Sequence, residues 1–305
     1  MRASVAGAPV SFGVFELTPA DAETMAPDDM LEALADAGYV GIDLGPLGYL
    51  GTGTDLRDRL RRFDLELAGG WVQLPFTDDD AFEAALPSLE DALGAFSAAA
   101  ENARGRLPLP TLADDGSLLR QSAPGRGAEV DPVRRTAWDR LRVNTERAAA
   151  LVRARGFEPT FHHHAGTYVE SAAEIDRFLT DVDIDLTLDT GHLVLAGGDP
   201  VDALRRWGGR INHLHLKDVD RSILRRVING GGGMREVWSS GAFVAFGSGD
   251  VPLDAVMRAV DEIDFDGWIV VEQDVLNGPT VSLAEFARQR AADQQTNRAA
   301  LKEWT

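Results

Sequence analysis

All six histidines of this 305-residue chain lie between His162 and His215, and the rest of the sequence contains none. Imidazole is the commonest metal-binding side chain, and it titrates near neutral pH. Histidines confined to three short segments therefore indicate one chemical centre, provided that the fold brings the segments together. The segments are the run His162, His163 and His164, then His192 alone, then His213 with His215.

Charge and composition argue against several classes of function. The net charge is −19 and the pI is near 4.6, so the chain would repel nucleic-acid phosphates and anionic membranes. We therefore expect neither as a partner. No run reaches the roughly 20 apolar residues that span a bilayer, and no signal-like stretch begins the sequence, so a cytoplasmic location is expected. The absence of cysteine leaves nitrogen and oxygen as metal ligands.

Lysine occurs at two positions only, and the remaining basic residues are arginines. Lys302 lies near the C-terminus, whereas Lys217 follows His215 by two residues. Lysine is a compact point charge whose pKa responds strongly to its surroundings. Its retention beside His215 suggests a task that arginine would not perform.

Short apolar runs alternate with longer helical patterns along the whole chain, which is typical of repeated βα units. Eight such units in about 300 residues are what a closed (β/α)8 TIM barrel requires. We find no linker or repeat and predict one domain, residues 1–305. Pro108 and Pro110 argue against the fourth strand, because proline cannot donate a ladder hydrogen bond. Strands are predicted at residues 4–9, 40–44, 65–71, 106–112, 159–164, 185–189, 211–217 and 268–272.

Some helix ends can also be located. Pro27 opens a helix that closes at Gly38, and Ser171 begins a capping box with Glu174. We assign Glu174 and its neighbour Glu170 to helix capping and not to metal binding.

The longest irregular stretch is predicted from about residue 221 to 249 and contains four successive glycines at 230–233. Loops of this length in compact domains are usually functional. It either hinges over a pocket, with Trp238 and Phe243 as the cover, or is a plain surface insertion.

In a (β/α)8 barrel the active site lies at the C-terminal ends of the strands. Predicted strands five to eight each end in imidazole or carboxylate groups, and neighbouring strand ends meet at the barrel mouth. Unpaired buried carboxylates would cost several kcal/mol each or become protonated, and a divalent cation removes that cost. The ends read Phe-His-His-His at 161–164, Leu-Asp-Thr-Gly-His at 188–192, His-Leu-His-Leu-Lys-Asp at 213–218 and Val-Glu-Gln-Asp at 271–274.

These strand ends carry a family resemblance. The stretches His-His-His-Ala-Gly-Thr at 162–167, Leu-Thr-Leu-Asp-Thr-Gly-His at 186–192, and Gly-Trp-Ile-Val-Val-Glu-Gln-Asp at 267–274, with the 213–218 stretch, resemble the xylose isomerase-like superfamily of sugar isomerases and epimerases. Within it the pattern is most similar to that of inosose dehydratases. The likeness covers most of the chain and is patchy between about residues 75 and 155.

The resemblance implies one divalent metal ion, most often Mn²⁺ or Co²⁺, with Mg²⁺ or Zn²⁺ as further options. Its ligands would be Asp189, His215 and Glu272. A fourth ligand, a glutamate in many epimerases of the superfamily, is His162 here. Those epimerases use two metal-bound glutamates as paired acid and base groups, and this chain retains only Glu272. The replacement favours loss of water over epimerisation.

Dehydration requires a base for the proton α to a ketone, a metal for the enolate oxygen and an acid for the departing hydroxyl. For a cyclic polyol ketone or sugar we expect Glu272 or Lys217 to act as the base. His164 or His192 would protonate the leaving group. Lys217 is equally suited to holding the enolate. The remaining histidines, His163 and His213, are assigned structural roles.

Substrate contacts are proposed at several positions near the strand ends. Asp218 and Arg221 are candidates, with a surface ion pair as the alternative. Trp71 and Phe12 are candidates for an apolar wall against a ring substrate, with core packing as the alternative.

The main prediction is a metal-dependent lyase that dehydrates a keto-inositol or a related keto-polyol. A keto-sugar isomerase or epimerase is the alternative, and it requires a second metal-bound carboxylate on the fifth strand. An endonuclease IV-like enzyme shares the barrel, but the acidic charge argues against DNA. A non-catalytic sugar-binding protein would have no need of a metal. The sequence does not determine whether the chain forms homo-oligomers.

Overall fold

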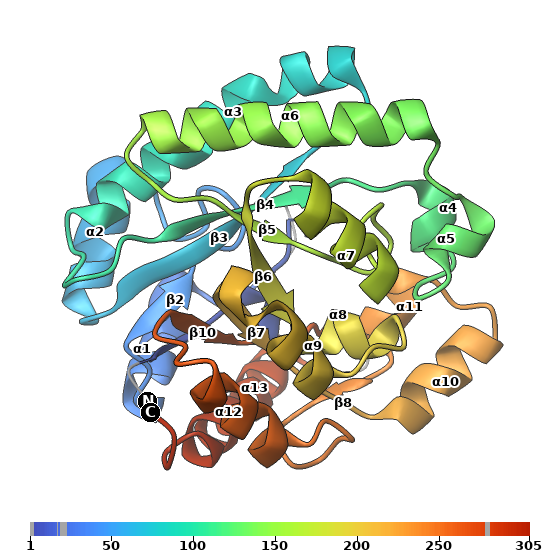
Figure 1. Cartoon of the computed structure of the whole chain (residues 1–305). Coiled ribbons are helices and arrows are strands. Elements are labelled where there is room, and N and C mark those ends of the chain that lie inside the picture. Colours follow the sequence, from blue (N-terminus) through green and yellow to red (C-terminus); the bar gives the residue numbers. More distant parts are fainter. Residues whose placement is uncertain (1–2, 17, 19–22, 278–280) are drawn as a thin grey trace.

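A closed barrel of parallel strands forms the centre of the protein, in the order β1-β10-β7-β6-β5-β4-β3-β2 (Figure 1). The structure, a computed structural model, describes residues 3–16, 18, 23–277 and 281–305. The predicted (β/α)8 barrel is confirmed. Its strands are β1 (Ser4–Gly7), β2 (Gly41–Asp43), β3 (Glu66–Leu74), β4 (Leu109–Asp114), β5 (Thr160–His162), β6 (Asp185–Asp189), β7 (Ile211–Leu216) and β10 (Trp268–Val271).

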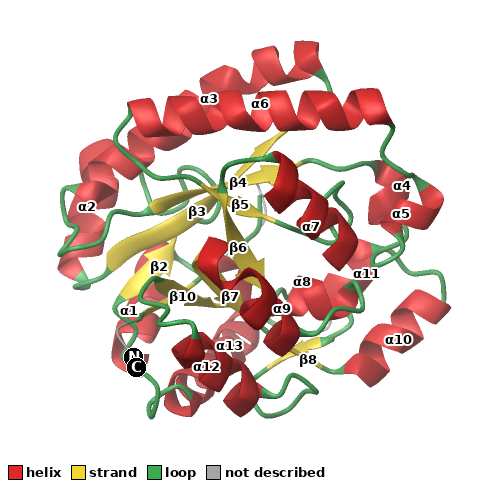
Figure 2. Ribbon diagram, viewed as in Figure 1, coloured by secondary structure: helices red, strands yellow, loops and turns green. Residues whose placement is uncertain are grey.

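Helices surround this barrel (Figure 2). In the described part of the chain, none has the length and apolarity that a membrane span requires. The α-helices are α1 (Pro27–Ala37), α2 (Gly53–Arg62), α3 (Asp79–Ala100), α4 (Leu118–Gln121), α5 (Gly127–Val130), α6 (Arg135–Ala154), α7 (Ala172–Asp181), α8 (Thr190–Leu195), α9 (Pro200–Trp207), α10 (Arg221–Asn229), α11 (Met234–Ser239), α12 (Leu253–Glu262) and α13 (Leu283–Ala300), with 3₁₀ turns η1 (Pro9–Phe12) and η2 (Gly208–Arg210).

All eight predicted strands are present, including the fourth. Pro108 precedes β4 and Pro110 is its second residue, so both prolines lie where the strand begins and little of the ladder is lost. Helix α1 ends as predicted, because Gly38 adopts the left-handed conformation with φ of 89°.

The predicted irregular loop between residues 221 and 249 is wrong. Helices α10 and α11 lie within it, and β9 (Phe243–Val244) pairs antiparallel with β8 (Asp218–Val219). Asp220 caps α10 by accepting the N–H groups of Ser222 and Ile223. The glycine run lies between the two helices. The run of four glycines predicts irregular structure. The two short helices beside it form because caps and tertiary packing stabilise them, and local sequence patterns do not show that packing.

Helix α7 begins with the predicted capping box between Ser171 and Glu174. The assignment of Glu170 to the same task is wrong. Its buried carboxylate lies 2.7 to 2.9 Å from three backbone nitrogens and accepts their N–H groups, so it ties together the loops after β4 and β5. These groups belong to Gly125, Gly127 and Gly166.

Small residues and one tryptophan fill part of the barrel interior. Trp268 is 2% exposed and packs with Ala6, Ala68 and Val270. A Cβ atom at Gly41 would lie 2.7 Å from the indole ring, so glycine is required there to admit the tryptophan. Trp268 therefore occupies space that a smaller side chain would leave empty.

We predict that Trp268→Ala lowers the free energy of unfolding by about 3 to 5 kcal/mol, through lost burial and the cavity that remains. Urea denaturation measures the change. Leu118→Ala is the matched control, because Leu118 is 85% exposed and its truncation should change stability by less than about 0.5 kcal/mol. A loss below about 1 kcal/mol for Trp268→Ala would contradict this account of the barrel interior.

Candidate active site

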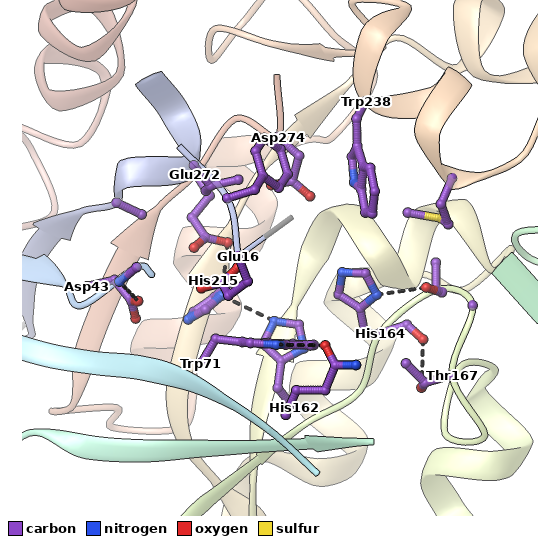
Figure 3. Close-up of a pocket in the computed structure, with 18 of the residues that line it drawn as sticks. Glu16, Asp43, Trp71, His162, His164, Thr167, His215, Trp238, Glu272 and Asp274 are labelled. Atoms are coloured by element: carbon purple, nitrogen blue, oxygen red, sulfur yellow. Dashed lines mark hydrogen bonds and ion pairs between the residues drawn. The ribbon is translucent and has the colours of Figure 1, made fainter. Parts of the chain in front are cut away.

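Four side chains from neighbouring strand ends meet at the C-terminal mouth of the barrel, and Figure 3 shows His162, His215 and Glu272 among them. His162 ends β5 and Asp189 ends β6, whereas His215 lies in β7 and Glu272 directly follows β10. The β6–β7 register pairs Asp189 with His215. All four side chains are buried. The order β5-β6-β7-β10 thus gathers two imidazoles and two carboxylates in one place.

The donor atoms of His162, Asp189 and His215 lie close enough together to hold one metal ion, and Glu272 lies beside His215. Nε2 of His162 lies 3.3 Å from Oδ2 of Asp189 and 3.2 Å from Nδ1 of His215. The same His215 nitrogen lies 3.0 Å from Oε2 of Glu272. Ligand atoms bonded at about 2.1 Å to one ion lie roughly 3 to 4 Å apart. Mixed nitrogen and oxygen donors of this kind suit divalent ions such as Mn²⁺, Co²⁺ or Zn²⁺.

Lys217 carries the positive charge at this site. Its Nζ atom lies 2.9 Å from Oδ2 of Asp189, 3.0 Å from Oε2 of Glu272 and 2.8 Å from Oδ1 of Asp274. Burial by itself lowers the pKa of Lys217, but these carboxylates raise it well above its usual range. For Glu272 the directions are opposite. Burial by itself raises the pKa of this carboxyl, but the neighbouring His215 and Lys217 lower it below its usual value. Lys217 is therefore an ammonium among carboxylates.

The residues after β6 position this lysine. The Thr190 hydroxyl accepts the backbone N–H of Lys217 and donates to its carbonyl oxygen, at 2.8 and 2.9 Å. A Cβ atom at Gly191 would lie 2.7 Å from the Lys217 Cβ atom, so a glycine leaves room for the side chain. The Thr-Gly pair therefore fixes the lysine backbone and clears its path to the carboxylates.

His164 is the most open of the imidazoles and lines the pocket. Its Nδ1 atom lies 2.7 Å from the carbonyl oxygen of Ala165 (Figure 3). A carbonyl only accepts hydrogen bonds, so Nδ1 carries the proton and Nε2 has a free lone pair. Burial first, and then the neighbouring His192, lower the pKa of His164 well below its usual value. His164 is thus a neutral proton acceptor.

His192 belongs to the cluster but does not line the pocket. Its ring centroid lies 3.6 Å from that of His164. Its Nε2 atom lies 3.3 Å from Oδ2 of Asp274 and 3.2 Å from Nζ of Lys217. The structure places His192 behind the pocket wall, where it supports His164 and Lys217.

The remaining two histidines are fully buried. Nε2 of His163 accepts the backbone N–H of Asp189 at 3.1 Å and so holds the end of β6. His213 lies inside the barrel against Gly69, where a Cβ atom would approach its ring to 3.1 Å. Neither lines the pocket.

Two predicted substrate contacts do not reach the pocket. Arg221 begins α10 and is absent from the pocket wall. The buried Asp218 carboxylate accepts backbone N–H groups and thereby holds the loop that follows β9. The donors are Val219, Gly247, Gly249 and Val251.

Aromatic side chains form part of the pocket wall. Trp71 lines it as predicted and meets His162 and His164 edge-on, with centroid distances of 5.2 and 5.1 Å (Figure 3). Phe12 does not line it, because its ring is 1% exposed within the core. Phe15 and Trp238 are in the wall instead. Trp238 lies in α11, within the stretch predicted as an irregular loop.

Five carboxylates that line the pocket had no predicted role: Glu16, Asp43, Asp114, Asp115 and Asp274. Asp274 follows Glu272 by two residues, Asp43 ends β2 and Asp114 ends β4. A polar residue at the end of an apolar barrel strand is a candidate site residue, and this signal points to Asp43 and Asp114.

A (β/α)8 barrel with buried imidazoles and carboxylates at the C-terminal mouth has the architecture of an enzyme. The chain belongs to the xylose isomerase-like TIM barrel family, which it matches over residues 31–292. Inosose dehydratase of Geobacillus kaustophilus strain HTA426 is 31% identical over 291 residues, covering 92% of this chain and 91% of that protein. The rhizopine catabolism protein MocC of Rhizobium meliloti is 31% identical over 275 residues, covering 87% and 80%.

Solved structures share the fold. The probable 3-DHS dehydratase AsbF of Bacillus anthracis has a TM-score of 0.68 at 15% identity and covers 98% of both chains. D-allulose 3-epimerase of Methylomonas sp. has the same TM-score and identity and covers 100% of this chain and 98% of its own. At this identity the structures show the barrel alone. The sequence relatives support an enzyme with a dehydratase-like function.

Stability should depend on pH through Asp114. Burial raises its pKa to about 7, above the 3.8 of an ordinary aspartate. The folded state therefore holds the proton longer, and stability is lost as pH rises through 7. Between pH 5 and 8 the free energy of unfolding should fall about 2 to 3 kcal/mol more in the wild type than in Asp114→Asn.

Urea denaturation at both pH values measures this difference. The exposed Asp80 in α3 provides the control, because Asp80→Asn removes a charge without removing a buried carboxylate. Parallel pH dependence in the wild type and Asp114→Asn would show that Asp114 does not titrate in this range.

Proposed function

We propose that the protein is a metal-dependent hydro-lyase that removes water from a keto-inositol or a related cyclic polyol ketone. Relatives called inosose dehydratase align along nearly the whole chain and support this substrate class. One observation carries the proposal. The free Nε2 lone pair of His164 belongs to the same pocket as three of the donors, His162, His215 and Glu272, and Asp189 lies directly beside His162.

The ion would be held by His162, Asp189 and His215, whose donor atoms lie close together, with the neighbouring Glu272 as the fourth ligand. When bound, a divalent ion supplies Lewis acidity, which polarises the ketone and stabilises the enolate charge. The ammonium of Lys217 lines the same pocket, and its positive charge would stabilise negative charge that develops on a substrate oxygen.

The proton steps are assigned to His164. The carboxylate of Glu272 is engaged by His215 and Lys217, and Lys217 is protonated, so neither suits the role of base that the sequence suggested. His164 Nε2 accepts the proton as the Cα–H bond breaks and its electron pair forms the enolate. The resulting imidazolium returns that proton to the β-hydroxyl as the C–O bond breaks, and water leaves. His164 thus keeps its predicted role towards the leaving group.

We predict that His164→Gln lowers kcat by about 10²- to 10⁴-fold, the usual contribution of a positioned acid or base. Metal content should stay the same, because His164 is not in the donor set. The assay follows the absorbance of the enolisable diketone formed from inosose. Chelation of the wild type should abolish turnover, and added Mn²⁺ or Co²⁺ should restore it. Unchanged kcat in His164→Gln would exclude His164 as the base.

His162→Glu tests the alternative, a keto-sugar isomerase or epimerase. The substitution places a second carboxylate on β5, so the variant should still bind metal while dehydration of inosose falls at least 10-fold. Chromatography of the products distinguishes loss of water from epimer formation. If the wild type forms epimers of keto-sugars without losing water from inosose, the epimerase is the correct function.

A further inference from the structure

We propose that Asp114 forms a recognition subsite that accepts a hydrogen bond from a ring hydroxyl of the substrate and excludes anionic substrates. This inference rests on the proposed function, in which the pocket binds a cyclic polyol ketone. Asp114 ends β4, next to β5 in the barrel, and it is not in the metal donor set.

The Asp114 carboxylate presents one free oxygen. Its side chain is 1% exposed and lines the pocket. Oδ2 accepts the backbone N–H groups of Gly116 and Tyr168, each at 3.0 Å. Within the described residues Oδ1 has no hydrogen-bond partner. A buried acceptor without a partner destabilises the protein, so a ligand that donates a hydrogen bond to it binds more tightly.

The loops around Asp114 are held in place before any ligand binds. Gly116 has a φ of 65°, and a Cβ atom there would lie 2.1 Å from the carbonyl oxygen of Gly166, so the loops after β4 and β5 touch at this point. The fully buried Arg120 donates to the carbonyl oxygen of Thr167 at 2.6 Å and pairs with Glu174 at 2.9 Å. A fixed acceptor favours a rigid, polyhydroxylated ring.

Among the described residues, the pocket offers a phosphate or carboxylate group no lysine or arginine that is free of carboxylate partners. Of the described residues that line it, Lys217 is the only lysine or arginine, and three carboxylates already surround its ammonium. A divalent ion together with Lys217 would balance the charges of Asp189, Glu272 and Asp274. The carboxylates that line the pocket are Glu16, Asp43, Asp114, Asp115, Glu272 and Asp274.

Asp114→Asn inverts the subsite with almost no change of shape. The N–H groups of Gly116 and Tyr168 need an acceptor, so the amide oxygen takes the place of Oδ2. The amide NH₂ group then takes the place of Oδ1 in the pocket wall. An acceptor becomes a donor, which repels a hydroxyl proton and attracts an anion.

Calorimetry on the metal-loaded protein at about pH 8.5 tests this, because Asp114, whose pKa burial raises to about 7, is then ionised and Oδ1 is an acceptor. The two ligands are myo-inositol, an uncharged ring without a ketone, and its monophosphate. The wild type should bind myo-inositol at least 10-fold more tightly than the phosphate. Asp114→Asn should weaken binding of myo-inositol about 10- to 100-fold and reduce the preference. Asp80→Asn is the control and should bind as the wild type does. With inosose, Asp114→Asn should raise KM and leave kcat within about threefold.

A wild type that does not prefer the uncharged ring, or an Asp114→Asn variant that binds it unchanged, overturns the proposal. Thermal unfolding shows whether the variant is folded, and an unchanged KM in a folded variant would make Asp114 purely structural. The two proposals fail differently. If the wild type prefers the uncharged ring but does not remove water from inosose, the subsite stands and the dehydratase function falls.

Discussion

Three buried carboxylates around one ammonium are the constraint on which the site depends. The carboxylates of Asp189, Glu272 and Asp274 are buried at the barrel mouth. The loss of hydration would cost several kcal/mol for each of them without a compensating charge. Lys217 contacts all three. An ammonium is compact and donates in three directions, whereas a guanidinium is a planar fork that matches one carboxylate at a time. This explains a lysine at the centre of a protein whose other cations are almost all arginine.

The same arrangement determines the state of the histidines. Burial lowers the pKa of the imidazoles, and the Lys217 ammonium opposes a further positive charge on His192. His164 therefore stays neutral, and its bond to Ala165 directs the free lone pair away from the backbone. Charge balance at the metal donors and proton acceptance at His164 are consequences of one packed cluster.

Buried polar residues away from the reacting groups hold the loops that shape the pocket. Asp218, Glu170 and Arg120 all bond mainly to backbone groups of loops at the barrel mouth. Barrel strands place the chemical groups, and these carboxylates and the guanidinium make the surrounding loops rigid enough to present Asp114. A rigid wall supports recognition because little conformational entropy is lost when a ligand binds.

The sequence by itself determined the barrel and the meeting of its histidine and carboxylate strand ends. Alternation of apolar strands with helices is a local signal, and residues at the ends of consecutive parallel strands must meet at one mouth. The choice of His162, Asp189, His215 and Glu272 as metal ligands came from the family resemblance and stays a prediction. The tertiary structure alone decided what faces the pocket. It placed His192 behind His164, turned Asp218 to the backbone and left Phe12 in the core. Side-chain direction and hydrogen-bond partners depend on contacts between segments far apart in the chain, and local patterns do not record them.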